Sequence, residues 1–206
     1  MIIDIDIYIV YGNTINNMGA IKSKFKGSKS KSNSKKKKKL DLPESSSARK
    51  TVDPRLPFQT YRQIFSLRNA WKAVTRSMEE IAKENLLRFL KKNPEYVEHF
   101  SSYDSEKPEE EIKESFEFET DAMDIFGLFD DVVNNLEEVD KALSQIRHEF
   151  SANEKIQQLL KDMNPTFMEL ISETLGDRFT AATEENFRLL YNFILTEGEK
   201  CISGEI

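Results

Sequence analysis

The feature that most constrains the fold of this 206-residue chain is the spacing of its apolar residues. Large apolar side chains recur every three or four positions in one long stretch: Phe118, Ala122, Ile125, Phe129, Val132, Val133 and Leu136. This spacing gives an α-helix one apolar face and does not match the alternation of a β-strand. Glycine (7) and proline (6) are scarce, which disfavours an all-β protein built on tight turns. We therefore predict an all-α protein.

Several other segments have the same spacing, and some are bounded by helix start and stop signals. Ser77 to Glu80 matches a capping box, and Thr180 is a plausible N-cap. Asn164 and Pro165 suit the cap and the first turn of a helix. Gly176 is a stop signal. The predicted helices cover residues 64–74, 78–92, 118–136, 139–150, 163–175 and 181–194.

The charge distribution divides the chain into two parts. Met18 to Leu40 contains ten lysines and no acidic residue, whereas 20 of the 30 basic and 34 of the 36 acidic residues follow Leu40. We predict a disordered tail over residues 1–56 and one folded domain over 57–203. The single cysteine, Cys201, excludes an intramolecular disulfide and favours a reducing compartment. No run of about 18 apolar residues is present, so we expect no membrane-spanning helix.

The tail combines two signals for membrane attachment. The stretch "MGAIKS", Met18 to Ser23, matches the N-myristoylation pattern, with Gly19 as the acyl acceptor. Acylation of Gly19 requires translation to start at Met18 instead of Met1. One acyl chain needs a second signal for stable anchoring. The lysines that we expect to contact an anionic membrane surface include Lys22, Lys24, Lys26, Lys35, Lys36, Lys37, Lys38 and Lys39.

The alternative for the tail is a solvated basic arm or a nucleic-acid patch. We favour the membrane because the acylation pattern directly precedes the lysine run, and we expect no nucleic-acid partner. The predicted location is the cytoplasm, at the inner leaflet of the plasma membrane.

The order of segments after Pro57 resembles the globin family, and especially neuroglobin and the neuronal globins of invertebrates. The resemblance is carried by "SLRNAWKAVTRS" with Trp71, "LLRFLKKNPEYVEHF" with Pro94 and Phe100, "FETDAMDIFGLFDDVVNNLEE" and "LGDRFTAATEENFRLLY". It implies a globin fold of seven or eight helices. It also implies a haem whose iron is bound by a proximal histidine and which takes up oxygen or another diatomic gas such as nitric oxide.

The same resemblance assigns the site residues. It places Phe100, Phe118 and Ile125 in the haem pocket, with Asp121 at the distal position, where an ionised carboxylate cannot donate a hydrogen bond to bound oxygen. The spacing from Leu143 and Ile146 places Phe150, which cannot bind iron, at the proximal position. His148 is the candidate proximal ligand, although two residues correspond to a helix rotation of about 200°. For His148 to bind iron, its helix would have to shift, unwind or carry a compensating gap. The alternative is that His148 is a surface histidine.

Two functions follow from the resemblance. The first is a haem-binding globin tethered to the membrane, which senses a gas or exchanges electrons with a redox or signalling partner instead of carrying oxygen in bulk. The alternative is a haem-free signalling or adaptor module whose cavity is filled by its own side chains, such as Phe150 or Phe126, or by a lipid-like ligand. We find no catalytic motif and expect no enzyme activity beyond redox chemistry at a haem.

Overall fold

The computed structural model describes residues 51–153 and 155–204, and every regular element within them is a helix. The predicted all-α class is confirmed. The α-helices are α1 (Tyr61–Val74), α2 (Met78–Lys92), α3 (Glu109–Glu114), α4 (Phe116–Asn134), α5 (Val139–Ala152), α6 (Ile156–Leu175) and α7 (Ala181–Ser203), and the 3-10 helices are η1 (Thr75–Ser77), η2 (Pro94–His99) and η3 (Gly176–Arg178). None of these helices is long and apolar enough to cross a membrane. The predicted acylation site Gly19 and the predicted membrane-binding lysines lie outside the described residues.

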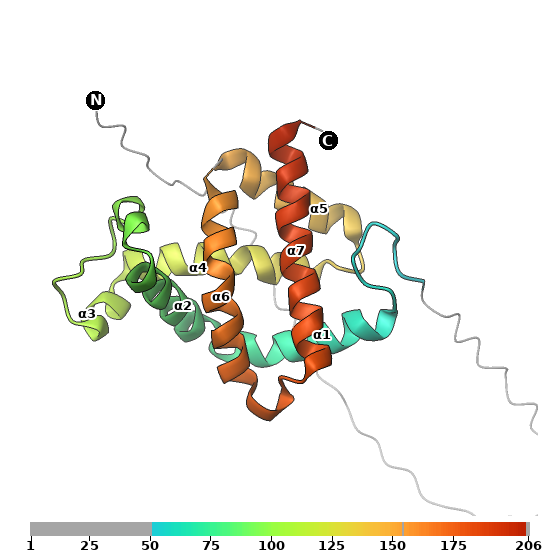
Figure 1. Cartoon of the computed structure of the whole chain (residues 1–206), viewed down its shortest axis with the longest axis horizontal. Coiled ribbons are helices and arrows are strands. Elements are labelled where there is room, and N and C mark those ends of the chain that lie inside the picture. The colour runs from blue at the N-terminus through green and yellow to red at the C-terminus, as the bar shows by residue number, and fades with distance from the viewer. Residues whose placement is uncertain (1–50, 154, 205–206) are drawn as a thin grey trace, which may run out of the picture. The chain divides into compact units, whose positions relative to one another are not determined.

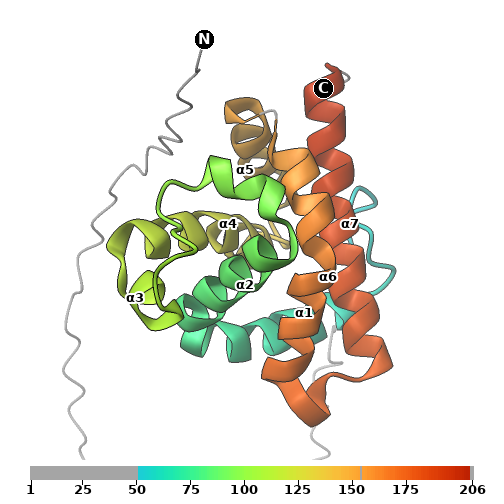
Figure 2. The same cartoon turned by 60° about the vertical axis from the view of Figure 1, so that its left-hand side comes forward.

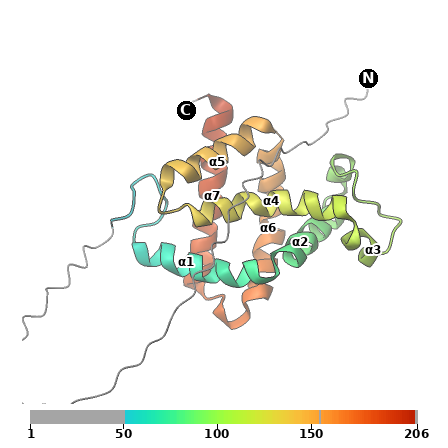
Figure 3. The ribbon, with the colours of Figure 1, turned by 180° about the vertical axis from the view of Figure 1, so that it is seen from behind.

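The helices of the folded body cross one another in two directions. α6 and α7 lie side by side (Figures 1 and 2). From behind, α1 and α4 are seen to run across this pair (Figure 3). α2 packs on both α4 and α6, whereas α5 packs on α4 and α7. Residues from α4, α5 and α7 are thereby brought together, although α7 is distant from α4 in sequence.

The centre of the body is a cluster of aromatic side chains from α1, α4, α6 and α7. The rings of Phe129 and Phe167 are stacked with centroids 4.7 Å apart, and Tyr191 lies 5.1 Å from Phe129. Trp71 is almost fully buried and stacks on Phe126 at 6.3 Å. The polar atoms of these rings have partners: Trp71 Nε1 donates to Asp130 at 2.8 Å, and the Tyr191 hydroxyl donates to the backbone carbonyl of Leu160 at 2.7 Å. This cluster ties the two crossing sets of helices together.

Two of the predicted helix signals are confirmed by the structure. The Thr180 side chain accepts a hydrogen bond from the backbone N–H of Thr183, so it caps α7. Gly176 ends α6 with a positive φ of 51°, a conformation that glycine adopts without strain. These residues form the turn between α6 and α7, which run antiparallel (Figure 1).

Of two other predicted signals, the one at Ser77 was right about the helix start but not about the cap hydrogen bond, and the one at Asn164 and Pro165 was wrong. Ser77 precedes α2 but its side chain makes no cap hydrogen bond. Asn164 and Pro165 do not start α6, which begins at Ile156 and contains Pro165 in its interior. The buried residues Ile156 and Leu160 explain this difference, because they extend the apolar face of α6 upstream of the proline. Tertiary packing therefore outweighs the helix-breaking tendency of proline.

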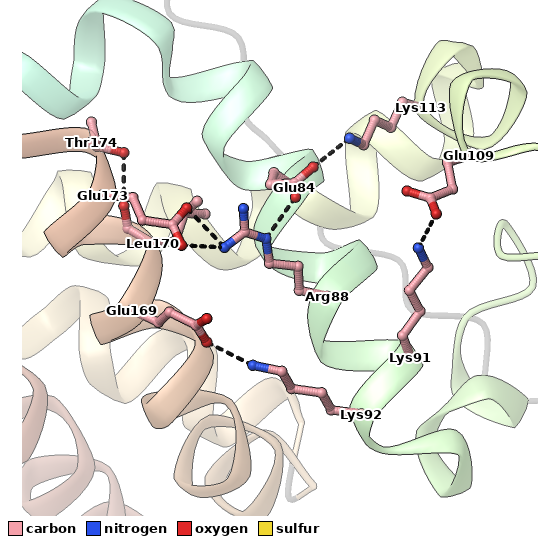
Figure 4. Close-up of polar contacts among 10 residues, drawn as sticks. All are labelled: Glu84, Arg88, Lys91, Lys92, Glu109, Lys113, Glu169, Leu170, Glu173 and Thr174. Carbon is pink, nitrogen blue, oxygen red and sulfur yellow. Dashed lines mark hydrogen bonds and ion pairs between the residues drawn. The ribbon is translucent and has the colours of Figure 1, made fainter.

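Ion pairs join α2 to α3 and α6 on one side of the body (Figure 4). Arg88 of α2 contacts Glu84 at 2.6 Å and Glu173 of α6 at 2.9 Å. Further pairs are Lys92 with Glu169 at 2.7 Å, Lys113 with Glu84, and Lys91 with Glu109. All are partly exposed, so each contributes little to stability. They show that the basic side chains of α2 already have acidic partners.

Candidate functional site

The proximal position of the predicted pocket is occupied by Phe150, in the last turn of α5. Its side chain is fully buried, with 0% of its surface exposed. The ring lies directly on Gly198 of α7, because a Cβ atom added to this glycine would be 2.1 Å from Cε1 of Phe150. A side chain at residue 198 therefore has no room while the Phe150 ring is in place. The residue at the proximal position makes a helix–helix contact and offers no atom that could bind iron.

His148 lies on the outer side of α5 and is exposed to solvent. Two helical positions separate it from the buried Phe150, which corresponds to a rotation of about 200°. The neighbouring Glu149 is half-buried. Burial raises the pKa of its carboxyl group, and the nearby His148 opposes this increase. The structure thus does not bring His148 together with the predicted pocket residues.

The predicted distal residues lie on α4 and on the segment after η2. Phe118 is fully buried, and Phe100 and Ile125 are only 5% and 8% exposed. Asp121 is half-buried and accepts a hydrogen bond of 2.5 Å from the Ser102 hydroxyl. Burial raises the pKa of Asp121, whereas the hydrogen bond from Ser102 lowers it. The apolar residues therefore lie in the interior as expected, and the distal carboxyl group is held by a serine from the neighbouring loop.

Carboxyl groups of α4 and α5 lie near one another beside this region. The pKa of Asp124 is raised to about 6, chiefly because the group is half-buried and further because Asp121 and Glu149 lie nearby. The pKa of Asp131 is also raised, by burial and by Asp130. These acids are therefore in a less favourable environment, when ionised, than they are in the unfolded chain.

This environment predicts that Asp124→Asn stabilises the protein at high pH. A carboxyl group with a raised folded-state pKa favours folding at low pH and loses that contribution as the pH rises through about 6. After allowance for solvent screening at this half-exposed position, we expect a gain of about 1 kcal/mol in the free energy of unfolding at pH 8 and none at pH 4. Urea denaturation at both pH values measures this difference.

Asp177→Asn, at an exposed position in η3, is the matched control and should change stability by less than about 0.5 kcal/mol at either pH. An equal gain for Asp124→Asn at pH 4 and pH 8 would contradict the electrostatic explanation.

Two residues in contact with predicted site residues, Gly198 and Ser102, and one further residue, Gln157, were missed in the sequence. Gly198 had a signal, since a glycine inside a helical segment often has a packing reason. Ser102 had none. Gln157, the second residue of α6, has both side-chain amide atoms, Nε2 and Oε1, buried without a hydrogen-bond partner. Such an orphaned amide carries an energetic cost, and nothing in the local sequence pattern predicts it.

Comparison with known proteins places the chain in a family. The sequence model of the globin family matches residues 83–197, which is more than half of the chain. The helices α3 to α6 and the turn at Gly176 lie within the matched residues. The protein belongs to the globin family. No curated protein matches the chain.

Solved structures of a haem protein, a neuroglobin and a haemoglobin have the same fold. The hexacoordinated haem protein of an anhydrobiotic tardigrade is 22% identical, with 73% of this chain and 99% of that chain covered and a TM-score of 0.67. The neuroglobin of the marine acoel Symsagittifera roscoffensis is 15% identical (68% and 97% covered, TM-score 0.59). The haemoglobin of the botfly Gasterophilus intestinalis is also 15% identical (69% and 97% covered, TM-score 0.60). At these identities the likeness concerns the fold.

The residues at the expected haem position do not fit an iron bound by a histidine. Phe150 has no ligating atom, and the space above Gly198 is filled by the ring of Phe150 itself. Both histidines of the chain, His99 and His148, are exposed. Within residues 51–153 and 155–204, no three His, Cys, Asp or Glu side chains are grouped so that they could hold a metal ion. The chain therefore belongs to the globin family, but the residue at the expected proximal position cannot bind iron.

Proposed function

We propose that this globin is a signalling or adaptor module at the inner surface of the plasma membrane that works without a histidine-bound haem. The proposal is carried by Phe150, which is fully buried on Gly198 at the position that the family resemblance assigns to the iron ligand. Reversible gas binding in globins depends on a ligated iron. Without this ligand, the folded body can still present its surface to a protein partner.

Haem binding is the second candidate function. It is supported by membership of the globin family and by the haem protein and globins among the structural neighbours. In this case the protein would bind oxygen or nitric oxide for sensing, or transfer electrons to a redox partner. His148 would then have to turn inward. The end of α5 at Ala152, close to the start of α6, is where the helix would have to rearrange.

The membrane location is supported by the sequence of the tail. The acylation pattern at Gly19 and the ten lysines between Met18 and Leu40 are two signals that together suffice for stable anchoring. A tethered protein is poorly suited to carry oxygen in bulk, because a carrier works by diffusing freely. Local signalling beneath the membrane agrees with both the tail and the body.

Titration of the purified full chain with haemin tests the choice between the two functions. We expect no Soret band beyond that of free haemin, and no difference among the wild type, His148→Ala and the control His99→Ala. The physical reason is that neither histidine faces the interior. A strong Soret band in the wild type and in His99→Ala that is lost in His148→Ala would overturn the proposal in favour of the haem-binding function.

A further inference from the structure

Gly198 lies within α7, at a place where the backbone itself does not call for glycine. Helix interiors generally favour alanine over glycine. Gly198 is buried, and an added Cβ atom would lie 2.1, 2.2 and 2.5 Å from three ring atoms of Phe150. The ring cannot easily move away, because Phe150 has no exposed surface. The glycine is therefore explained by the phenylalanine, from a different helix.

A second contact joins the same two helices one turn further along α7. Cys201 lies three residues after Gly198 and so on the same face of the helix. Its Sγ atom is 3.2 Å from the Ser151 hydroxyl and 3.7 Å from the backbone carbonyl of Arg147. The end of α5 is thus held on α7 by Phe150 and Ser151 together. We call these four residues, Phe150, Ser151, Gly198 and Cys201, the α5–α7 clasp.

We propose that the α5–α7 clasp occupies the place where the globin resemblance expects the proximal half of a haem site. In it, Phe150 and Gly198 are a matched pair: the absent side chain of one makes the room that the ring of the other fills. The fold thereby completes its interior with its own residues and holds α5 on α7 without a cofactor. The inference rests on the proposed haem-independent function but concerns a separate property, the coupling between two residues.

A double-mutant cycle on the haem-free full chain tests this pair. The variants are Gly198→Ala, Phe150→Ala and the double variant, with the melting temperature measured by far-UV circular dichroism. In the wild-type background, Gly198→Ala should lower the melting temperature by roughly 5–10 °C, because the added methyl group collides with the ring. In the Phe150→Ala background, the same change should raise the melting temperature or leave it unchanged, because the ring is gone and alanine favours the helix.

The sign of the Gly198→Ala effect decides the outcome. A similar decrease in both backgrounds would overturn the matched pair. If Gly198→Ala alone does not fold, Phe150→Ala and the double variant still form a valid comparison: a higher melting temperature for the double variant supports the pair, and a decrease overturns it.

The haemin titration tests the proposed function, and the double-mutant cycle tests the coupling between Phe150 and Gly198, so the two can fail separately. Haemin binding that depends on His148 would contradict the proposed function alone, since the cycle is measured without haemin. An additive cycle together with no haemin binding would leave the proposed function standing and remove the clasp as its structural basis.

Discussion

Replacing Lys36, Lys37 and Lys38 with glutamine is expected to weaken binding of the protein to anionic vesicles about 100-fold. Each lysine near an anionic surface contributes about 1 kcal/mol, so three of them contribute about 3 kcal/mol, and 1.4 kcal/mol corresponds to a factor of ten. The measurement is co-sedimentation of the chain beginning at Met18 with vesicles of phosphatidylcholine and phosphatidylserine. The difference should shrink at high salt, since added ions screen the attraction.

Three exposed lysines of the globin body provide a matched control. Glutamine at Lys72, Lys155 and Lys161 makes the same change in net charge outside the tail. We expect this variant to bind vesicles almost as the wild type does. Equal losses for the two triple variants would mean that total charge, and not the tail, governs the attraction.

In cells, membrane association that is unchanged in Gly19→Ala would contradict acylation at this glycine.

Replacing Trp71 with alanine is expected to lower the free energy of unfolding by about 3–5 kcal/mol. Trp71 is 1% exposed and lies 6.3–6.5 Å from the rings of Phe126, Phe129 and Phe187, so its removal leaves a cavity at the meeting point of three helices. It also removes the donor to the half-buried Asp130. Urea denaturation followed by far-UV circular dichroism measures the loss, since the variant has no tryptophan left for fluorescence.

Phe65→Ala is the control on the same helix. Phe65 is 58% exposed, so its replacement should change the free energy of unfolding by less than about 0.5 kcal/mol. If Trp71→Ala does not fold, Trp71→Phe should still lose more stability than Phe65→Ala, because it cannot donate to Asp130. Overlapping unfolding curves for the two positions would contradict the central role of the aromatic cluster.

Membership of the globin family does not by itself establish that this chain binds iron. The match to the globin family covers residues 83–197, which include buried residues such as Phe118 and Phe129. Iron binding depends on one ligating atom at one position, where this chain has Phe150. A family pattern that covers more than half of the chain can therefore coexist with a different chemistry at a single residue.

Much of the fold could be predicted because it depends on local spacing. The recurrence of apolar residues every three or four positions predicts α4, α5 and α7, since a helix places these residues on one face. The capping role of Thr180 and the stop at Gly176 are equally local. The start of α6 could not be predicted in this way. The local signal at Pro165 competes with burial of Ile156 and Leu160, and that burial depends on helices from elsewhere in the chain.

The sequence by itself determined the helical class, the globin resemblance and the basic tail, because these depend on residue type, spacing and charge along the chain. It also placed Phe150 and His148 on opposite sides of one helix. Only the tertiary structure decided what Phe150 does there. The packing of α5 on α7 brings the ring onto Gly198. The spacing of residues within α5 cannot predict this contact, because it depends on a glycine in a helix that is far away in the sequence.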